Sequence, residues 1–189
     1  MSKASSKRLG YIGSVPGHGQ PGRDSDSWYT PQKYIESARK VLGRIDLDPF
    51  SSLTANGRVR ARRIITAEQD ATRTAWTTPS KPIRVWMNPP YSARLIKAAC
   101  ALFVEGVKCG RIEAGVVLVN NATDTLWFHE LMSQASAVCF TKGRIAFENF
   151  DGKHVSGNTR GQAFVYFGAE VEMFKSEFEQ YGCVLKVNV

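Results

Sequence analysis

The chain has 189 residues, and 43% of them are hydrophobic, so it is large enough to bury the core of one compact domain. Its 25 Lys and Arg residues outnumber its 17 Asp and Glu residues, and the resulting net charge of +8 favours a polyanionic partner. The sequence has no apolar stretch as long as a membrane span and no signal-peptide core, so we expect a soluble, cytoplasmic protein.

The four cysteines predict no metal site. They stand at positions 100, 109, 139 and 183, form no C-x-x-C pair and have no histidine at the spacing of a zinc ligand. We therefore expect buried or idle thiols in a reducing compartment.

The first 27 residues differ in composition from the rest. They are rich in Ser, Gly and Pro, carry scattered basic residues and cannot bury enough apolar surface to order themselves. We expect a flexible basic tail over residues 1–27 and one folded domain over residues 28–189.

The folded part is expected to begin with a helix. Thr30 is a good N-cap, Pro31 suits the first helical position, and the apolar spacing continues until Gly43. We predict strands over residues 45–48 and 59–66.

The middle of the chain reads as strand, helix, strand. Residues 83–87 are a short β-rich run, Ser92 caps a helix with its apolar stripe over residues 95–103, and residues 114–119 are almost continuously apolar. Such a continuous run is typical of a central strand that is buried on both faces.

The last third contains a predicted hairpin with a long polar loop. Its strands are residues 144–148 and 162–167, and the loop is residues 149–161. The remaining predicted elements are a helix at 124–132, a strand at 137–140, a helix at 170–180 and a strand at 184–187. Together these elements indicate an α/β fold with a three-layer mixed sheet and an antiparallel C-terminal hairpin.

The most informative motif is Asn88-Pro89-Pro90-Tyr91, which directly follows the strand at 83–87. Open α/β sheets bind ligands at the ends of their strands, and the two prolines stiffen this turn. The Asn88 amide carbonyl and the Pro89 main-chain carbonyl are two acceptors beside the Tyr91 ring, which suits a flat ligand with an exocyclic amine. The alternative is a Pro-Pro turn in which Asn88 caps and Tyr91 packs.

Two carboxylates are candidates for binding a second ligand. Asp48 ends the first strand, where it could accept from an ammonium group, and the small side chain of Ser51 would let backbone amides approach. Asp70 could accept from the amine of a purine. Taken alone, Asp48 is more often a turn cap and Asp70 a helix cap.

The order of these blocks resembles the phage-type Dam family of DNA N6-adenine methyltransferases, which use S-adenosylmethionine. The matching blocks are Trp28-Tyr29-Thr30-Pro31, Asp48-Pro49-Phe50-Ser51-Ser52 with Asn56, Met87-Asn88-Pro89-Pro90-Tyr91-Ser92, residues 119–129, residues 142–147 and residues 163–168. The resemblance covers about residues 28–168 and implies a Rossmann-like class I methyltransferase domain.

The resemblance also implies roles for individual residues. Asn88 and Pro89, with Pro90, would hold the target amine, and Tyr91 would stack on a base flipped out of the duplex. The residues implied at the donor are Trp28, Tyr29, Thr30, Pro31, Asp48, Pro49, Phe50, Ser51 and Asp70. The family further implies double-stranded DNA as partner and a phage or prophage gene with a role in restriction-modification, active in the host cytoplasm. We also expect a monomer or weak dimer and no metal.

The basic excess supplies candidates for phosphate contacts. They are Arg58, Arg60, Lys142, Arg144, Lys153 and Arg160. Alternation along the predicted strand at 59–66 would place Arg58, Arg60 and Arg62 on one face, which could equally be a solvated surface.

Two other functions stay open at this point. The same motif also serves methyltransferases that act on RNA or on protein glutamine, and a catalytically dead copy of the fold could bind nucleic acid.

Overall fold

The computed structural model describes residues 29–76, 81–149, 152–154 and 158–187. The predictions for the 1–27 tail and for Trp28 lie outside these residues. The described helices are α1 (Gln32–Leu42), α2 (Leu53–Val59), α3 (Ala93–Lys108), α4 (Leu126–Met132) and α5 (Val171–Phe178). The described strands are β1 (Leu47–Asp48), β2 (Arg63–Ile64), β3 (Ile83–Met87), β4 (Ile112–Asn120), β5 (Ala137–Thr141), β6 (Gln162–Phe167) and β7 (Gly182–Lys186).

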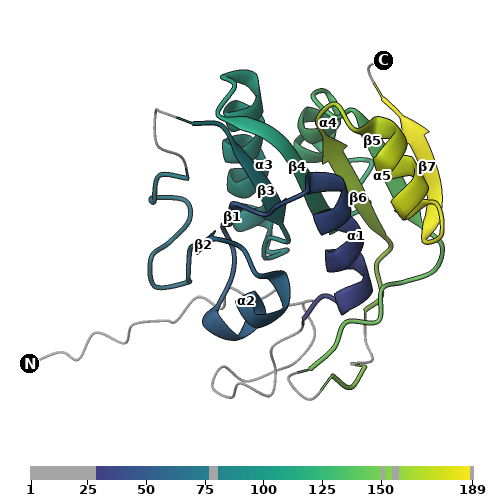
Figure 1. Cartoon of the computed structure of the whole chain (residues 1–189), viewed down its shortest axis with the longest axis horizontal. Coiled ribbons are helices and arrows are strands. Elements are labelled where there is room, and N and C mark those ends of the chain that lie inside the picture. The colour runs from purple at the N-terminus through teal and green to yellow at the C-terminus, as the bar shows by residue number, and fades with distance from the viewer. Residues whose placement is uncertain (1–28, 77–80, 150–151, 155–157, 188–189) are drawn as a thin grey trace, which may run out of the picture.

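The strands form one mixed sheet in the order β2-β1-β3-β4-β6-β5-β7 (Figure 1). Strands β2, β1, β3 and β4 run parallel to one another, whereas β6 runs antiparallel to both β4 and β5. Strand β7 is antiparallel to β5. The predicted mixed α/β sheet with an antiparallel C-terminal part is therefore confirmed.

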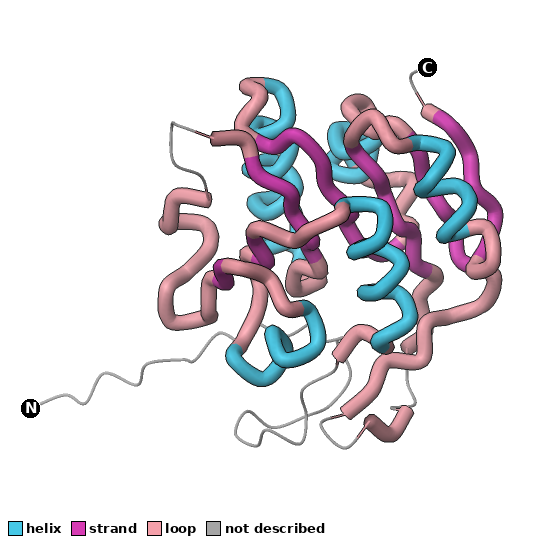
Figure 2. Tube along the Cα trace, viewed as in Figure 1, coloured by secondary structure: helices cyan, strands magenta, loops and turns pink. Residues whose placement is uncertain are grey.

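Helices cover both faces of this sheet, with α1 and α5 on one side and α3 and α4 on the other (Figure 2). Strand β4 shows why three layers form. Its Val117 and Val119 pack with α3 and α4, while Val116 and Leu118 pack with α1 and α5, and all four are fully buried. The alternation of side chains along a strand thus fills two separate cores.

The start of α1 differs from the prediction. The N-cap position is Pro31, not Thr30, and it makes no side-chain capping bond. The Thr30 hydroxyl instead accepts a hydrogen bond from Asn88. The predicted end of the helix at Gly43 is confirmed, since Gly43 has a φ of 68° there.

The predicted strand over residues 59–66 is wrong for most of its length. Residues 53–59 form α2, which Ser52 caps by accepting from the Ala55 amide at 3.1 Å, and only Arg63 and Ile64 pair as β2. Asn56 exchanges two hydrogen bonds with the backbone of Ala61, and this pair holds the left-handed turn at Arg60. Arg58, Arg60 and Arg62 therefore do not share one face of a strand.

The predicted strand at 144–148 is also wrong. The hairpin is formed by β5 and β6, and residues 144–148 form no strand; Glu148 makes isolated bridges to Tyr29 and to His154. Ser92 does stand at the N-cap of α3, as predicted, although its side chain makes no capping bond.

Candidate active site

The candidate site lies at the edge of the sheet where the parallel strands end. Asp48 is the last residue of β1, Asn88 directly follows β3, and Asn120 is the last residue of β4. Because β1, β3 and β4 are adjacent and parallel, these three residues lie side by side along one edge. The antiparallel strand β6 begins at the same edge with Gln162 opposite Asn120.

Asp48 is a buried carboxylate, with 3% of its surface exposed. Its Oδ1 accepts from the amide of Phe50 at 3.3 Å, and burial raises its pKa from the ordinary 3.8 to about 7, although hydrogen bonds from Ser51 and Phe50 oppose the rise. No Lys, Arg or His among the described residues forms an ion pair with it. The site therefore has a carboxylate suited to a cationic ligand.

The amide of Asn88 is held from two sides. Its Nδ2 donates to Thr30 Oγ1 at 3.1 Å, and its Oδ1 accepts from the Tyr91 hydroxyl at 2.9 Å. Pro89 and Pro90 are buried, whereas Asn88 and Tyr91 are half-buried. Desolvation raises the pKa of Tyr91, so its hydroxyl stays protonated and able to donate at neutral pH.

The segment before α1 reaches this amide because a distant loop holds it in place. The backbones of Tyr29 and Glu148 exchange two hydrogen bonds, at 2.6 and 2.9 Å. Arg58 forms an ion pair with Glu148 at 2.5 Å and lies 5.3 Å from the centre of the Tyr29 ring. Tyr29, Thr30 and Pro31 are all buried, and the structure brings Thr30 into direct contact with Asn88.

Asp70 lies in a separate turn and has a φ of 54°. Its Oδ1 accepts from the backbone and the hydroxyl of Thr72, at 2.9 and 2.7 Å. The same turn reaches the Asp48 segment through Trp76, whose ring lies 6.0 Å from that of Phe50. The role of Asp70 at a donor stays a prediction.

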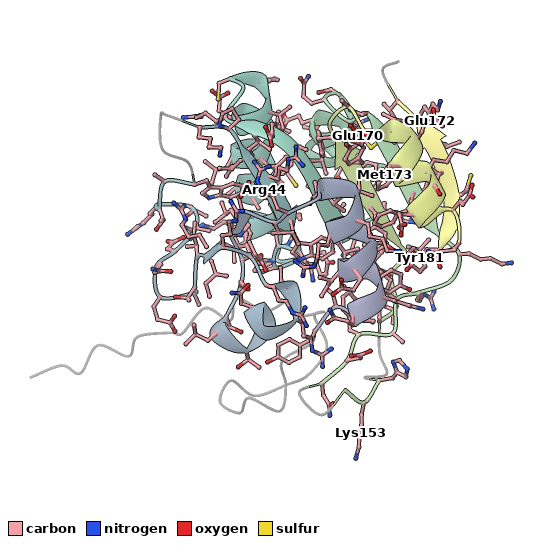
Figure 3. The ribbon with its side chains drawn as sticks, in the orientation of Figure 1. Arg44, Lys153, Glu170, Glu172, Met173 and Tyr181 are labelled. Atoms are coloured by element: carbon pink, nitrogen blue, oxygen red, sulfur yellow. The ribbon has the colours of Figure 1, made fainter. Side chains whose placement is uncertain are left out.

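The predicted basic residues fall into two environments. Arg58 is paired with Glu148, with 23% of its side chain exposed, while Arg60 is exposed at the end of α2. The others are exposed on the segment that joins β5 to β6, and they are Lys142, Arg144, Lys153 and Arg160. Figure 3 shows Lys153 projecting away from the body of the molecule.

The sequence did not predict a network of amide side chains centred on Gln162, which is 1% exposed. Its Oε1 accepts from the Ile145 amide at 3.2 Å, and its Nε2 donates to the Arg160 carbonyl at 2.8 Å and to Asn120 at 3.3 Å. Asn158 bonds to both ends of the same amide. One polar residue at the start of an otherwise apolar strand was the available signal. The network ties the β5–β6 segment to the end of β4.

No group of three His, Cys, Asp or Glu side chains among the described residues is placed to hold a metal ion. Within the same residues, the structure contains no helix that combines the length and the hydropathy of a membrane span.

Comparison with known proteins identifies a family for most of the chain. A family model described as DNA N-6-adenine-methyltransferase (Dam) matches residues 19–184. A comparison with curated proteins finds no match.

Proposed function

Since the chain belongs to the DNA N-6-adenine-methyltransferase (Dam) family, we propose that it methylates the exocyclic amine of adenine in DNA with S-adenosylmethionine as donor. The observation that carries this proposal is the adjacency of Asn88 and Asp48 at the ends of neighbouring parallel strands. One residue suits an amine acceptor and the other a cationic donor. The arrangement of elements supports a Rossmann-like class I methyltransferase fold.

The residues at the end of β1 fit the donor. A buried carboxylate that no described cation pairs with is costly to ionise, so the α-ammonium of a methionine-type ligand would stabilise it. We assign Asp48 and the buried residues that follow it, Pro49, Phe50 and Ser51, to this end of the donor. Trp28, Tyr29, Pro31 and Asp70 remain proposed donor residues from the family resemblance. S-adenosylmethionine supplies a methyl group on a sulfonium, which is electrophilic.

The residues after β3 fit the acceptor. The lone pair of the adenine amine is delocalised into the ring, so the nitrogen is a poor nucleophile. Asn88 Oδ1 and the Pro89 carbonyl would accept its two hydrogens and so favour a tetrahedral nitrogen with more available electron density. The rest of the rate enhancement would come from positioning, because an in-line displacement depends on alignment. Tyr91 would leave its bond to Asn88 and stack on the base.

Adenine inside a duplex cannot reach these groups, so we propose that the base is flipped out of the stack. Exposed cations on the β5–β6 segment, with Arg60, would hold the backbone phosphates. Arg58 is already engaged by Glu148, and we propose that it supports this surface from within.

The test is transfer of labelled methyl from S-adenosylmethionine to unmethylated duplex DNA, followed by digestion of the product to nucleosides. We expect the label in N6-methyldeoxyadenosine. If RNA or protein glutamine carries the label and DNA carries none, the proposed DNA acceptor is wrong. Donor binding without any transfer would indicate a binding module that has lost its activity.

A further inference from the structure

We propose that Thr30 is a positioning residue that fixes the amide of Asn88 for the acceptor amine. This inference rests on the proposed function and deepens it, because it separates Thr30 from the donor pocket to which the family resemblance assigns it. The contact that carries it is the 3.1 Å hydrogen bond from Asn88 Nδ2 to Thr30 Oγ1, between residues 58 positions apart in the sequence.

The proposed chemistry needs one end of the Asn88 amide and not the other. An amine hydrogen can be accepted by Oδ1, whereas Nδ2 is only a donor and would repel it. The arriving amine selects the orientation in which Oδ1 faces it, and Nδ2 then needs an acceptor of its own. Thr30 Oγ1 is that acceptor, so the half-buried amide keeps its hydrogen bonds while its oxygen is used.

The Thr30 hydroxyl is rigidly placed. Thr30 is 6% exposed, Tyr29 before it is paired on both backbone groups with Glu148, and Pro31 after it leads directly into α1. The Arg58–Glu148 ion pair fixes the other side of this backbone pairing. A side chain held by both neighbours can restrict the rotation of Asn88, which a mobile side chain could not do.

The Tyr91 hydroxyl cannot do the same work during the reaction. It bonds to Oδ1, which is the atom that the amine needs, and in the proposed mechanism the Tyr91 ring moves to stack on the flipped base, so we expect this bond to be lost when the acceptor binds. The bond to Thr30 lies at the opposite end of the amide and can persist throughout. Thr30 is therefore the protein contact that can hold Asn88 while the acceptor is present.

The experiment compares Thr30→Val and Thr30→Ser in the full chain. Valine keeps the shape of threonine but removes the acceptor, and serine keeps the hydroxyl. We expect Thr30→Val to lower the single-turnover rate of methyl transfer about tenfold or more at saturating donor and DNA, while the Kd for S-adenosylmethionine changes less than about twofold. Thr30→Ser should retain most of the rate.

Ser37→Ala is the matched control. Ser37 is a buried hydroxyl of α1 that bonds to the Tyr181 hydroxyl at 3.0 Å, outside the site. Its removal should leave the single-turnover rate unchanged. A thermal melt of each variant shows whether the domain remains folded.

A second readout does not depend on activity. In the ¹⁵N-labelled chain, with the Asn88 side-chain resonance assigned by its loss in Asn88→Asp, hydrogen exchange of the NH₂ group should be several-fold faster in Thr30→Val. Exchange in Thr30→Ser should match the wild type.

The outcomes separate this inference from the proposed function. Weaker donor binding by Thr30→Val, with an unchanged rate at saturation and unchanged exchange at Asn88, would assign Thr30 to the donor pocket and overturn the inference. A wild-type chain that transfers no methyl to DNA would overturn the proposed function, and the exchange measurement would still decide whether Thr30 holds the amide.

Discussion

In the proposed mechanism Asn88 and Asp48 have separate tasks, although they stand at the ends of adjacent strands. Asn88 presents a neutral amide held by Thr30, and Asp48 presents a carboxylate that burial makes reluctant to ionise. A neutral acceptor for the amine and an anionic partner for the donor can therefore be tested one at a time by single substitutions.

Asn88→Ala should abolish methyl transfer while binding of S-adenosylmethionine persists. The substitution removes a side-chain acceptor, and loss of one preorganised group of this kind typically lowers the rate by a factor of about 10²–10³. Single-turnover methylation and calorimetric titration with the donor measure the two properties separately. Near-normal turnover in this variant would contradict the proposed grip on the amine.

The raised pKa of Asp48 predicts the pH dependence of stability. Its folded pKa of about 7 lies above the ordinary 3.8, so the native state holds the proton more tightly than the unfolded chain. The free energy of unfolding should therefore lose a contribution as pH rises from about 4 to 7, and this loss should be complete above pH 7. Urea titrations at pH 5 and pH 8 measure the effect.

Asp48→Asn is the matched variant for this prediction. The amide keeps the size of the side chain but cannot ionise, so the variant should be more stable than the wild type at pH 8 and closer to it at pH 5. Its affinity for S-adenosylmethionine should fall, and it should lack the increase in affinity between pH 6 and 8 that we expect of the wild type as Asp48 ionises. A variant with wild-type affinity at pH 8 would exclude the carboxylate from the donor site.

At the scale of elements, the geometry depends on how closely neighbours approach. Strand β4 passes under α3 at Gly115, where an added β-carbon would lie 2.5 Å from Phe103 Cζ and 3.2 Å from the Val85 carbonyl oxygen. Helix α2, in contrast, carries Gly57 in open space.

These two glycines give a matched pair of alanine substitutions. Gly115→Ala should lower the free energy of unfolding by about 1–3 kcal/mol, because a packed core must shift to admit a methyl group. Gly57→Ala should raise it by about 0.5–1 kcal/mol, because alanine favours a helix more than glycine does. Denaturant titration measures both. A destabilising Gly57→Ala would argue against helix α2.

Arg58 and Arg60 give a second pair at the end of α2. Arg58→Ala removes the ion pair that holds Glu148 beside Tyr29 and should cost about 1–3 kcal/mol of stability. Arg60→Ala leaves that contact intact and should be nearly neutral. Equal melting temperatures for the two variants would show that the Arg58–Glu148 pair does not stabilise the segment before α1.

At the scale of the whole molecule, the positive charge is not confined to the edge of the sheet that holds the candidate site. The net charge is +8, and Lys142, Arg144, Lys153 and Arg160 lie where β5 joins β6, at the edge that also holds Asn88. Lys108 ends α3 at the opposite edge, because α3 starts where β3 ends and stops before β4 begins. The position of a charge, and not its sign alone, should therefore decide its effect on DNA binding.

Substitution of the four β5–β6 cations by alanine should weaken DNA binding uniformly across sequences and flatten its salt dependence. Each lost phosphate contact should reduce the slope of log K against log salt by about one. Lys108→Ala should leave the slope unchanged. Fluorescence anisotropy over a range of salt concentrations measures the slopes. A wild-type slope in the variant with all four substitutions would show that DNA binds to another face.

The sequence by itself determined the features whose signals are local. The strand at Ile83–Met87, the buried strand around residues 114–119, the glycine end of α1 and the Asn-Pro-Pro-Tyr turn all follow from apolar periodicity and from proline and glycine geometry over a few residues. The motif order also pointed to the family that the comparison then showed.

Tertiary structure alone decided the features that depend on residues far apart in the chain. Threonine is a good N-cap residue, but the Thr30 hydroxyl accepts a hydrogen bond from Asn88 instead. Arginine is usually a free surface cation, but Arg58 forms an ion pair with Glu148. The apolar pattern that starts at residue 59 suits a strand, but the side-chain bonds of Ser52 and Asn56 stabilise helix α2 and the turn that follows it. Periodicity reports which side of an element is buried, whereas the partner of a polar group depends on which distant segment the fold brings beside it.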